Sequence, residues 1–400
     1  MEHVEKFPFP KLVRRFIEQE SSAGIVMIFT TIAALLIANG PMYADYKHFI
    51  NIPLSFSLGD LYVSEPIKVW VKDLLMVLFF LLVGLELKRE FKEGFLSSPD
   101  QVLLPGIAAF AGMAVPAALY VLFHMSEPQL MSGWAVSSAT DIAFALAVLQ
   151  LAGKHAPPAV KIFLLAIAIF DDLGAILIIA FFYSNHLDVS VLGYVAAGIA
   201  ALVALNRARV GLVMPYMLLG IYLWFALYHA GIHTTLAGVM VGLAMPMRTG
   251  KPGDESPPSP VNQCIHFLHP WVAFLILPLF AFVSAGVHLR TLELAALAEP
   301  LPLSIAVALF AGKQIGIFLI TFLTVKLGLA SMPQGARWSH IYGVSVLAGI
   351  GFTMSLFIGY LAFDASLIDE VKLGVLTGSL ASSLFGALVF ALIRKDKADA

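Results

Sequence analysis

The apolar run VKIFLLAIAIFDDLGAILIIAFFY, residues 160–183, carries two adjacent aspartates near its centre, Asp171 and Asp172. A helix needs roughly 20 mostly apolar residues to cross the hydrocarbon of a bilayer, so this run is long enough to span one. A charged side chain at mid-bilayer costs about 2.5–3.5 kcal/mol, and ionisable residues found there usually serve a function. The run therefore predicts a membrane span with an ionisable site at its midpoint.

The whole 400-residue chain has the composition of a membrane protein. Hydrophobic residues make up 60% of it and charged residues only 12%, against about 25% charged in globular proteins. The 30 Phe and 11 Tyr exclude a disordered chain, and the net charge of −2 gives no reason to expect nucleic acid. The single cysteine, Cys264, excludes an internal disulfide and a multi-thiolate metal site. We expect an all-α polytopic membrane protein with one domain over residues 1–400 and no cofactor.

About twelve apolar segments are long enough to be transmembrane helices. They are Ser22–Asn39, Val71–Leu87, Pro105–His124, Trp134–Leu151, Val160–Tyr183, Ser190–Leu205, Val210–Tyr228, His233–Met247, Pro270–Val287, Leu301–Leu327, Ile341–Ala362 and Val371–Ile393. The positions of the basic residues test this count, because cytoplasmic loops accumulate Lys and Arg. With both termini inside, eighteen basic residues fall on the cytoplasmic side, and one lies within a span. Only five lie outside: Lys47, Lys68, Lys72, Arg290 and Lys372.

Four segments outside the spans have their own character. Residues 1–20 lack the apolar core of a signal peptide and alternate apolar with basic residues, which predicts a short helix on the inner membrane surface. Residues 50–66 alternate apolar with polar residues around Gly59-Asp60, which predicts a small extracellular β-hairpin whose edge could pair two copies of the chain. Residues 248–264 are a proline-rich cytoplasmic linker and 394–400 a basic cytoplasmic tail.

Four charged residues lie deep inside predicted spans: Asp141, Asp171, Asp172 and Lys313. Facing lipid they would cost on the order of 10 kcal/mol together. An ion pair between one aspartate and Lys313 leaves two carboxylates without a partner. Neighbouring residues point about 100° apart on a helix, so Asp171 and Asp172 cannot share one partner and at least one should face water.

This set of groups fits an exchange of protons for a small cation. Two carboxylates so close repel each other, which favours the protonated form of one of them. Hard cations such as Na⁺ prefer oxygen ligands, which Asp171, Asp172, Asp141 and the hydroxyl of Thr140 would supply. The pattern predicts a proton-coupled cation site.

Two spans are interrupted by small and polar residues. They read GWAVSSATD at 133–141 and GIGFTMS at 349–355. Interrupted segments at corresponding places in two halves of a transporter are typical of broken helices around a transport site. Spans three to five and ten to twelve would then be two inverted repeats. Asp141 and Lys313 have suitable signs to offset the partial charges at the half-helix ends. Close helix packing by Gly and Ser is the alternative explanation.

These motifs resemble a known transporter family. The runs ATDIAFAL (139–146), FDDLGA (170–175) and GIGFTMS (349–355), with FFLLVGLE (79–86) and LHPWVA (268–273), are similar to those of the bacterial Na⁺/H⁺ antiporters of the NhaA family. The resemblance extends over practically the whole chain.

The resemblance implies more than the residues alone. It implies twelve spans, an inverted-topology repeat, and discontinuous fourth and eleventh helices that cross at the midplane of the bacterial inner membrane. It implies electrogenic, alternating-access export of Na⁺ or Li⁺ in exchange for external H⁺, serving Na⁺ and pH homeostasis. Asp171 and Asp172 match the family's cation and proton carriers. Asp141 and Thr140 match residues of the helices that cross at the midplane. Lys313 matches a lysine that is either a proton carrier or a structural partner.

The family is also activated by alkaline pH through a cytoplasmic cluster. Glu86, Arg89 and Glu90 match part of that cluster, and His266 matches its histidine. This chain departs from the family pattern at two places: Ile265 replaces an acidic residue and Asn262 a basic one. We expect an altered pH threshold. A solvated helix end with pairing between residues four apart is the alternative explanation for Glu86–Glu90.

Three other functions use membrane-embedded acids. A symporter of small organic anions would need more basic groups than Lys313 near the site. An intramembrane aspartyl protease would need two aspartates that share one proton, and Asp141 with Asp171 is the pair available. A passive cation channel builds its acidic ring by oligomer symmetry, whereas these acids occur once each. The adjacent pair Asp171-Asp172 favours the antiporter, which is not an enzyme.

Overall fold

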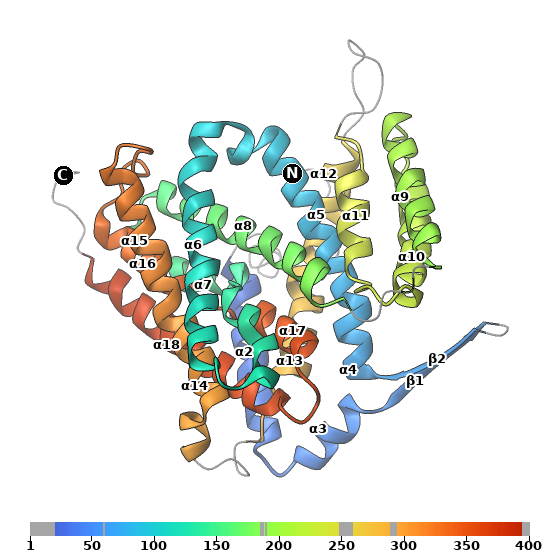
Figure 1. Ribbon diagram of the computed structural model, residues 1–400, viewed down its shortest axis with the longest axis horizontal. Helices are drawn as coiled ribbons and strands as arrows, with labels where there is room; N and C mark the ends of the chain where they lie inside the picture. The colour runs from blue at the N-terminus through green and yellow to red at the C-terminus, as the bar shows by residue number, and fades with distance from the viewer. Residues whose placement is uncertain are drawn as a thin grey trace, which may run out of the picture.

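The computed structural model describes residues 21–58, 61–184, 188, 190–247, 259–288 and 294–393. The predicted segments 1–20 and 394–400 lie outside this range, as do residues 248–258 of the predicted linker. The described chain is mostly helical (Figure 1). Its elements up to the first interrupted span are α2 (Ser21–Ala38), α3 (Tyr43–Ile50), β1 (Pro53–Leu58), β2 (Leu61–Pro66), α4 (Ile67–Trp70), α5 (Met76–Glu93), α6 (Pro99–Phe123), the 3₁₀ helix η4 (Pro128–Ser138) and α7 (Ile142–Ala152).

The second part of the chain continues the helical pattern. It contains α8 (Pro158–Phe182), α9 (Leu192–Arg207), α10 (Val213–His229), α11 (Leu236–Ala244), α12 (Pro260–Trp271), α13 (Leu277–Ala285), α14 (Pro300–Val307), α15 (Lys313–Lys326), α16 (Trp338–Leu347), α17 (Phe352–Ala362) and α18 (Ile368–Leu392). Two short 3₁₀ helices, η3 (Phe95–Ser97) and η7 (Leu294–Ala298), precede α6 and α14.

Among the described residues, three π-helical segments join helices end to end. Such segments are rare and often mark functional sites. They are η2 (Val71–Leu75) between α4 and α5, η5 (Val272–Ile276) between α12 and α13, and η8 (Ala308–Gly312) between α14 and α15. The last of these directly precedes Lys313.

Five of the described helices are long and apolar enough to cross a membrane, or up to eight if each of three bent helix pairs counts as one span. Two of the bent pairs are the interrupted spans: η4 with α7, bent by 47°, and α16 with α17, bent by 42°. Each of the twelve predicted segments coincides with helix, although several of these helices are short. The count of twelve and the inverted repeat stay predictions.

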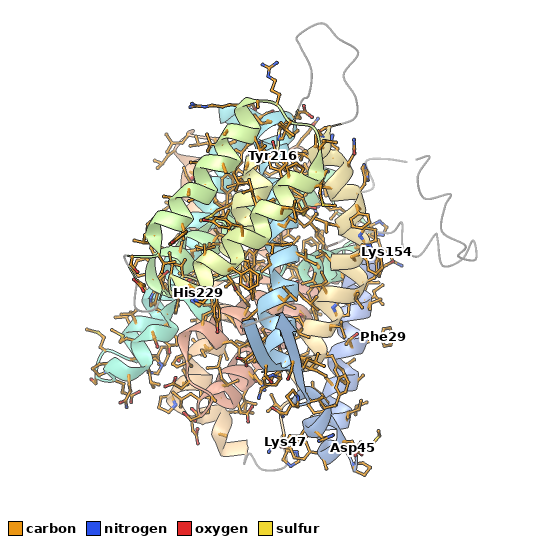
Figure 2. All side chains as sticks on the ribbon, turned by 90° about the vertical axis from the view of Figure 1, so that its right-hand side faces the viewer. Phe29, Asp45, Lys47, Lys154, Tyr216 and His229 are labelled. Carbon is orange, nitrogen blue, oxygen red and sulfur yellow. The ribbon has the colours of Figure 1, made fainter. Side chains whose placement is uncertain are left out.

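The surface of the helical body suits a lipid environment. Large apolar side chains stand out from its sides, among them Phe29 at 68% and Phe181 at 78% exposed. The charged residues Asp45 and Lys47 of α3 lie at one end, whereas Phe29 points outward from α2 (Figure 2). Exposed apolar area on this scale marks an interaction surface, here with the bilayer.

The segment 53–66 forms an antiparallel two-stranded ribbon that extends away from the helices (Figure 1). Pro53 pairs with Pro66 and Leu58 with Leu61. The Trp70 indole donates to the carbonyl of Glu65 and so ties the base of the ribbon to α4. Its side of the membrane and any pairing with a second copy stay predictions.

The predicted boundary of the ninth span was wrong by about ten residues. Helix α12 begins at Pro260, where the Ser259 hydroxyl caps it by accepting from the backbone of Asn262 at 3.4 Å. The last five residues of the predicted linker are therefore helical. Pro260 at the first helical position is favourable because its missing N–H needs no partner there.

Candidate functional site

The two interrupted spans meet at their breaks. Between η4 and α7, the backbone N–H of Asp141 donates to the carbonyl of Ile350 at 2.6 Å. The hydroxyl of Thr140 lies 2.8 Å from the carbonyl of Ala348. Residues more than 200 positions apart in the sequence therefore satisfy each other's unpaired backbone groups, which a break in the middle of a membrane protein requires.

Asp141 joins the N-termini of two half-helices. One carboxylate oxygen accepts from the backbone N–H of Phe144 at 3.0 Å and so caps α7. The other accepts from the backbone N–H of Thr353 at 3.1 Å, in the first turn of α17, and from the Thr353 hydroxyl. Helix N-termini carry partial positive charge, so one buried carboxylate stabilises both of them.

The Lys313 ammonium group lies at the C-terminal end of a helix, where the partial charge is opposite to that at an N-terminus. Its side chain is fully buried, and its ammonium donates to the carbonyl of Ser138 at 2.6 Å, at the C-terminal end of η4. It also lies 2.6 Å from Asp171 Oδ2 and 3.0 Å from the Thr140 hydroxyl. An ammonium group has three donors, and all three are used.

The two adjacent aspartates of α8 have different surroundings. Asp171 Oδ2 accepts from Lys313 and from the Thr140 hydroxyl at 2.6 Å, whereas Asp171 Oδ1 is buried without a hydrogen-bond partner. Asp172 is 4% exposed, and within the described residues no hydrogen bond or ion pair reaches its carboxylate. The expectation that at least one of the two acids faces water stays a prediction. As expected, the neighbouring acids do not share one partner.

Asp172 is nevertheless surrounded by charge. Its carboxylate lies within electrostatic reach of Asp171, Asp141, Glu86 and Lys313. The site thus gathers the four buried charges that the sequence singled out, from the break between η4 and α7, from α8 and from α15. Three acids face one ammonium group.

Sequence reasoning missed Thr353 as a member of the site. This residue supplies both a backbone and a side-chain donor to Asp141, and it is 2% exposed. Its only signal was a hydroxyl in the glycine-rich run 349–355. The contributions of Ser138, Ala348 and Ile350 are backbone carbonyls, which no residue type announces.

The residues expected to sense pH are only partly brought together. Glu86, Arg89 and Glu90 share the last turns of α5, where Arg89 Nη2 lies 3.5 Å from Glu90 Oε1. Glu86 is in electrostatic reach of Arg89 and Glu90 as well as of Asp172. His266 is exposed on α12, and within the described residues it makes no hydrogen bond or ion pair with the other three.

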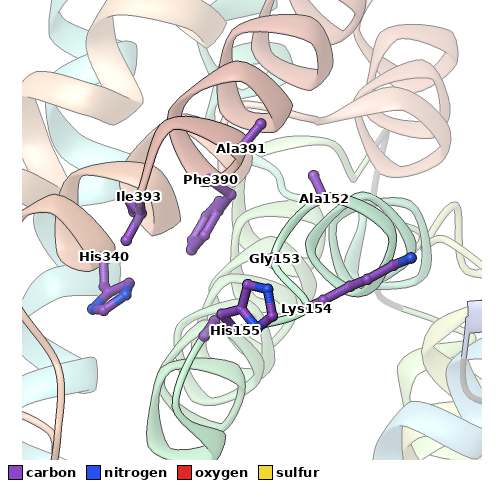
Figure 3. A pocket seen from close by; sticks show the side chains of 9 residues that line it. Ala152, Gly153, Lys154, His155, His340, Phe390, Ala391 and Ile393 are labelled. Carbon is purple, nitrogen blue, oxygen red and sulfur yellow. The ribbon is translucent and has the colours of Figure 1, made fainter. Parts of the chain in front are cut away.

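A cavity of about 220 Å³ lies apart from the buried charges (Figure 3). It is lined by the C-terminal ends of α7 and α18, the residues after α7, and His340 at the start of α16. His340 Nδ1 accepts from the backbone N–H of Arg337 at 3.0 Å. Because none of the four buried charges lines it, this cavity is separate from the site.

The geometry can be set beside known proteins. The family described as Na⁺/H⁺ antiporter 1 matches residues 14–390. The chain belongs to this family. It is 50% identical over 390 residues to the Na⁺/H⁺ antiporter NhaA of Sphingopyxis alaskensis, covering 97% of this chain and 91% of that protein.

Other relatives of the Na⁺/H⁺ antiporter 1 family agree. The chain is 48% identical over 384 residues to the Na⁺/H⁺ antiporter NhaA 2 of Saccharophagus degradans, covering 95% of this chain and all of that protein. It is 46% identical over 378 residues to the antiporter NhaA of Yersinia enterocolitica, covering 94% and 95% of the two chains. These relatives are named as transporters and not as enzymes, and the resemblance read from the motifs is confirmed.

Proposed function

We propose that the chain is an electrogenic secondary antiporter that exports Na⁺ or Li⁺ in exchange for external H⁺. It works by alternating access in the bacterial inner membrane, with both termini in the cytoplasm, and is activated at alkaline pH. The family assignment and the names of its relatives support Na⁺/H⁺ exchange. The arrangement of charge around Asp172 supports the exchange of a cation for protons, and the distribution of Lys and Arg supports cytoplasmic termini.

The charge balance of the site carries the proposal. Asp141 is offset by the N-termini of α7 and α17, each worth roughly half a positive charge. Asp171 is offset by Lys313 at 2.6 Å. Within the described part of the chain, Asp172 has no offsetting group of its own. A single monovalent cation, either a proton or a metal ion, balances the charge of the Asp172 carboxylate. Once one of them is bound, the charge is balanced and the other does not bind.

The free oxygens of the site suit a small hard cation. Asp171 Oδ1 has no hydrogen-bond partner, and both carboxylate oxygens of Asp172 are available. Oxygen ligands of this kind bind hard cations. A cation reaches both carboxylate oxygens of Asp171 only when the Lys313 ammonium group leaves Asp171 Oδ2. Cation binding is thereby coupled to the position of the ammonium group. If the Lys313 ammonium group loses one proton and Asp172 loses another, two protons exchange for one cation. Net charge then crosses the membrane in each cycle.

The regulatory and oligomeric parts of the proposal rest on two other regions. Glu86 links the end of α5 electrostatically to Asp172, so a change of charge at the cytoplasmic cluster of Glu86, Arg89, Glu90 and His266 reaches the site. The β1–β2 ribbon has an outer edge, and two such edges can pair between copies of the chain.

The alternatives fit this geometry poorly. An organic anion would add negative charge where three acids already face one ammonium group. A protease dyad needs two carboxylates that share a proton. Asp141 and Asp171 are instead engaged with Thr353 and Lys313, and no hydrogen bond joins them.

The test is Na⁺-induced collapse of a preformed pH gradient in everted membrane vesicles, from about pH 6.5 to 9. The parent protein is expected to respond to Na⁺ and Li⁺, increasingly with pH. The Asp172→Asn variant is expected to lose the response while reaching the membrane at parental levels. No response of the parent to either cation at any pH would refute the antiporter.

A further inference from the structure

The lysine of the site follows an irregular piece of helix. The π-helical segment η8 ends at Gly312, immediately before Lys313. A π turn shifts the helical hydrogen bonds by one residue and rotates everything after it relative to a regular helix. The direction of the Lys313 side chain therefore depends on how this turn is held.

Gln314 holds the turn from inside the same helix. Its side-chain amide nitrogen donates to the carbonyl of Phe310, within η8, at 2.8 Å. Its amide oxygen accepts from the hydroxyl of Tyr342 at 2.9 Å. Gln314 is 9% exposed. With its donor end and its acceptor end both engaged, the orientation of this amide is fixed.

Tyr342 belongs to the other side of the site. It lies on α16, which packs beside α15 (Figure 1) and leads directly into the second break. There the carbonyl of Ile350 accepts from the backbone N–H of Asp141, and the carbonyl of Ala348 lies 2.8 Å from the Thr140 hydroxyl. The hydrogen bond from Tyr342 to Gln314 therefore ties the broken span to the helix that carries the ammonium group.

The ring of Tyr342 is positioned independently of its hydroxyl. It packs edge-on against Phe318, with ring centroids 5.5 Å apart, and against Phe385 at 6.4 Å. Removing the hydroxyl alone thus leaves the aromatic packing in place. What it takes away is the fixed orientation of the Gln314 amide.

We propose that Gln314 and Tyr342 are a positioning pair that holds the Lys313 ammonium on Asp171 and thereby sets how strongly Na⁺ must compete for that carboxylate. The pair acts through the position of Lys313, since the hydrogen bonds of the Gln314 amide go to Phe310 and Tyr342. This inference rests on the proposed function, because it concerns the apparent Na⁺ affinity of the same site.

The test is the Tyr342→Phe variant, assayed in everted vesicles for Na⁺-driven proton movement at pH 8.5 over a range of Na⁺ concentrations. A less firmly held Lys313 competes less with the cation. The apparent KM for Na⁺ should fall at least threefold, with the maximal rate within twofold of the parent. Tyr222→Phe is the matched control, because its hydroxyl donates to the carbonyl of Tyr194 away from the site, and its KM should not change.

A second variant tests the same hydrogen bond from the side of Gln314. Gln314→Leu should lower the KM similarly, and the double variant Tyr342→Phe/Gln314→Leu should lower it no further than Gln314→Leu alone. Gln314→Leu also provides the readout if Tyr342→Phe fails to reach the membrane. Multiplying effects in the double variant, or parental KM values in both single variants, would overturn the pairing. A parent without Na⁺ response would instead overturn the proposed function.

Discussion

The two broken spans meet at one point but contribute different kinds of group. The break between η4 and α7 contributes side chains, the hydroxyl of Thr140 and the carboxylate of Asp141. The break between α16 and α17 contributes mostly backbone, the carbonyls of Ala348 and Ile350 and the N–H of Thr353. Each break takes part of its hydrogen bonding from the other: the N–H of Asp141 donates to Ile350, and the N–H of Thr353 donates to Asp141. A cluster of buried charges can therefore be held in part by a segment without a single charged residue.

Removing the ammonium group should have the largest effect on this arrangement. Lys313→Met leaves Asp171 buried and unpaired and takes the donor from the carbonyl of Ser138. Breaking a buried ion pair on one side destabilises by about 3–5 kcal/mol. We expect a loss of that size in thermal or chemical unfolding of the purified protein in detergent.

The matched control removes both charges. Lys313→Met with Asp171→Asn leaves no unpaired charge, and most of the lost stability should return. If Lys313→Met alone were as stable as the parent, the ion pair would not be what holds the first break.

Asp141→Ala tests the junction between the two breaks directly. The substitution uncaps α7 and α17 together, and each cap contributes about 0.5–2 kcal/mol. The expected loss is therefore about 1–4 kcal/mol in the same unfolding measurement. Thr353→Val is the comparison, because it removes only the hydroxyl donor to the carboxylate and keeps the backbone bond, so it should cost less than Asp141→Ala. Equal losses in the two variants would mean that the carboxylate does not join the two N-termini.

Gly349→Ala probes the second break, which contributes mainly backbone groups to the site. A Cβ at this position would lie 2.7 Å from the backbone oxygen of Leu309. Overpacking of this kind costs about 1–3 kcal/mol. Gly193→Ala in α9 is the control, since a Cβ there meets nothing within 4 Å. It should leave stability unchanged or raise it by up to about 1 kcal/mol. If Gly349→Ala were as stable as the parent, the backbones at Gly349 and Leu309 could move apart without a loss of stability.

The smallest expected effect comes from Glu86, which lies on α5, outside both breaks. Glu86→Gln removes one negative charge from those that face Asp172, so Asp172 should ionise with less repulsion. The pH profile of exchange should move to lower pH by about half a unit to one unit. Vesicle assays across pH measure this, with Glu93→Gln on the exposed end of α5 as the control. A profile that moved with neither Glu86→Gln nor His266→Ala would refute the sensor assignment.

The sequence was most informative where a residue was out of place. Asp141, Asp171, Asp172 and Lys313 lie in apolar runs where charge is unfavourable, so their mutual proximity could be predicted before any fold was known. The interrupted run 133–141 likewise announced a break.

Backbone contributions left no comparable signal. The run 349–355 has the composition of ordinary close helix packing, and nothing in it indicated that Thr353 would donate to Asp141. Local composition also could not show which aspartate takes Lys313, since this depends on the rotation of α8 against α15. The three π segments depend on tertiary packing in the same way, and the start of α12 was hidden by the prolines around Pro260.

The central claim is that, of the three aspartates in the described site, Asp172 is the one whose charge the site leaves unbalanced. The most direct measurement is proton release when Na⁺ is added to the purified protein in weakly buffered detergent solution at about pH 8, read with an indicator dye. The account predicts that the parent releases protons as Na⁺ binds, and that Asp172→Asn releases fewer or none, while choline releases none from either. Na⁺ binding to the parent without proton release, or equal release from the Asp172→Asn variant, would contradict the account.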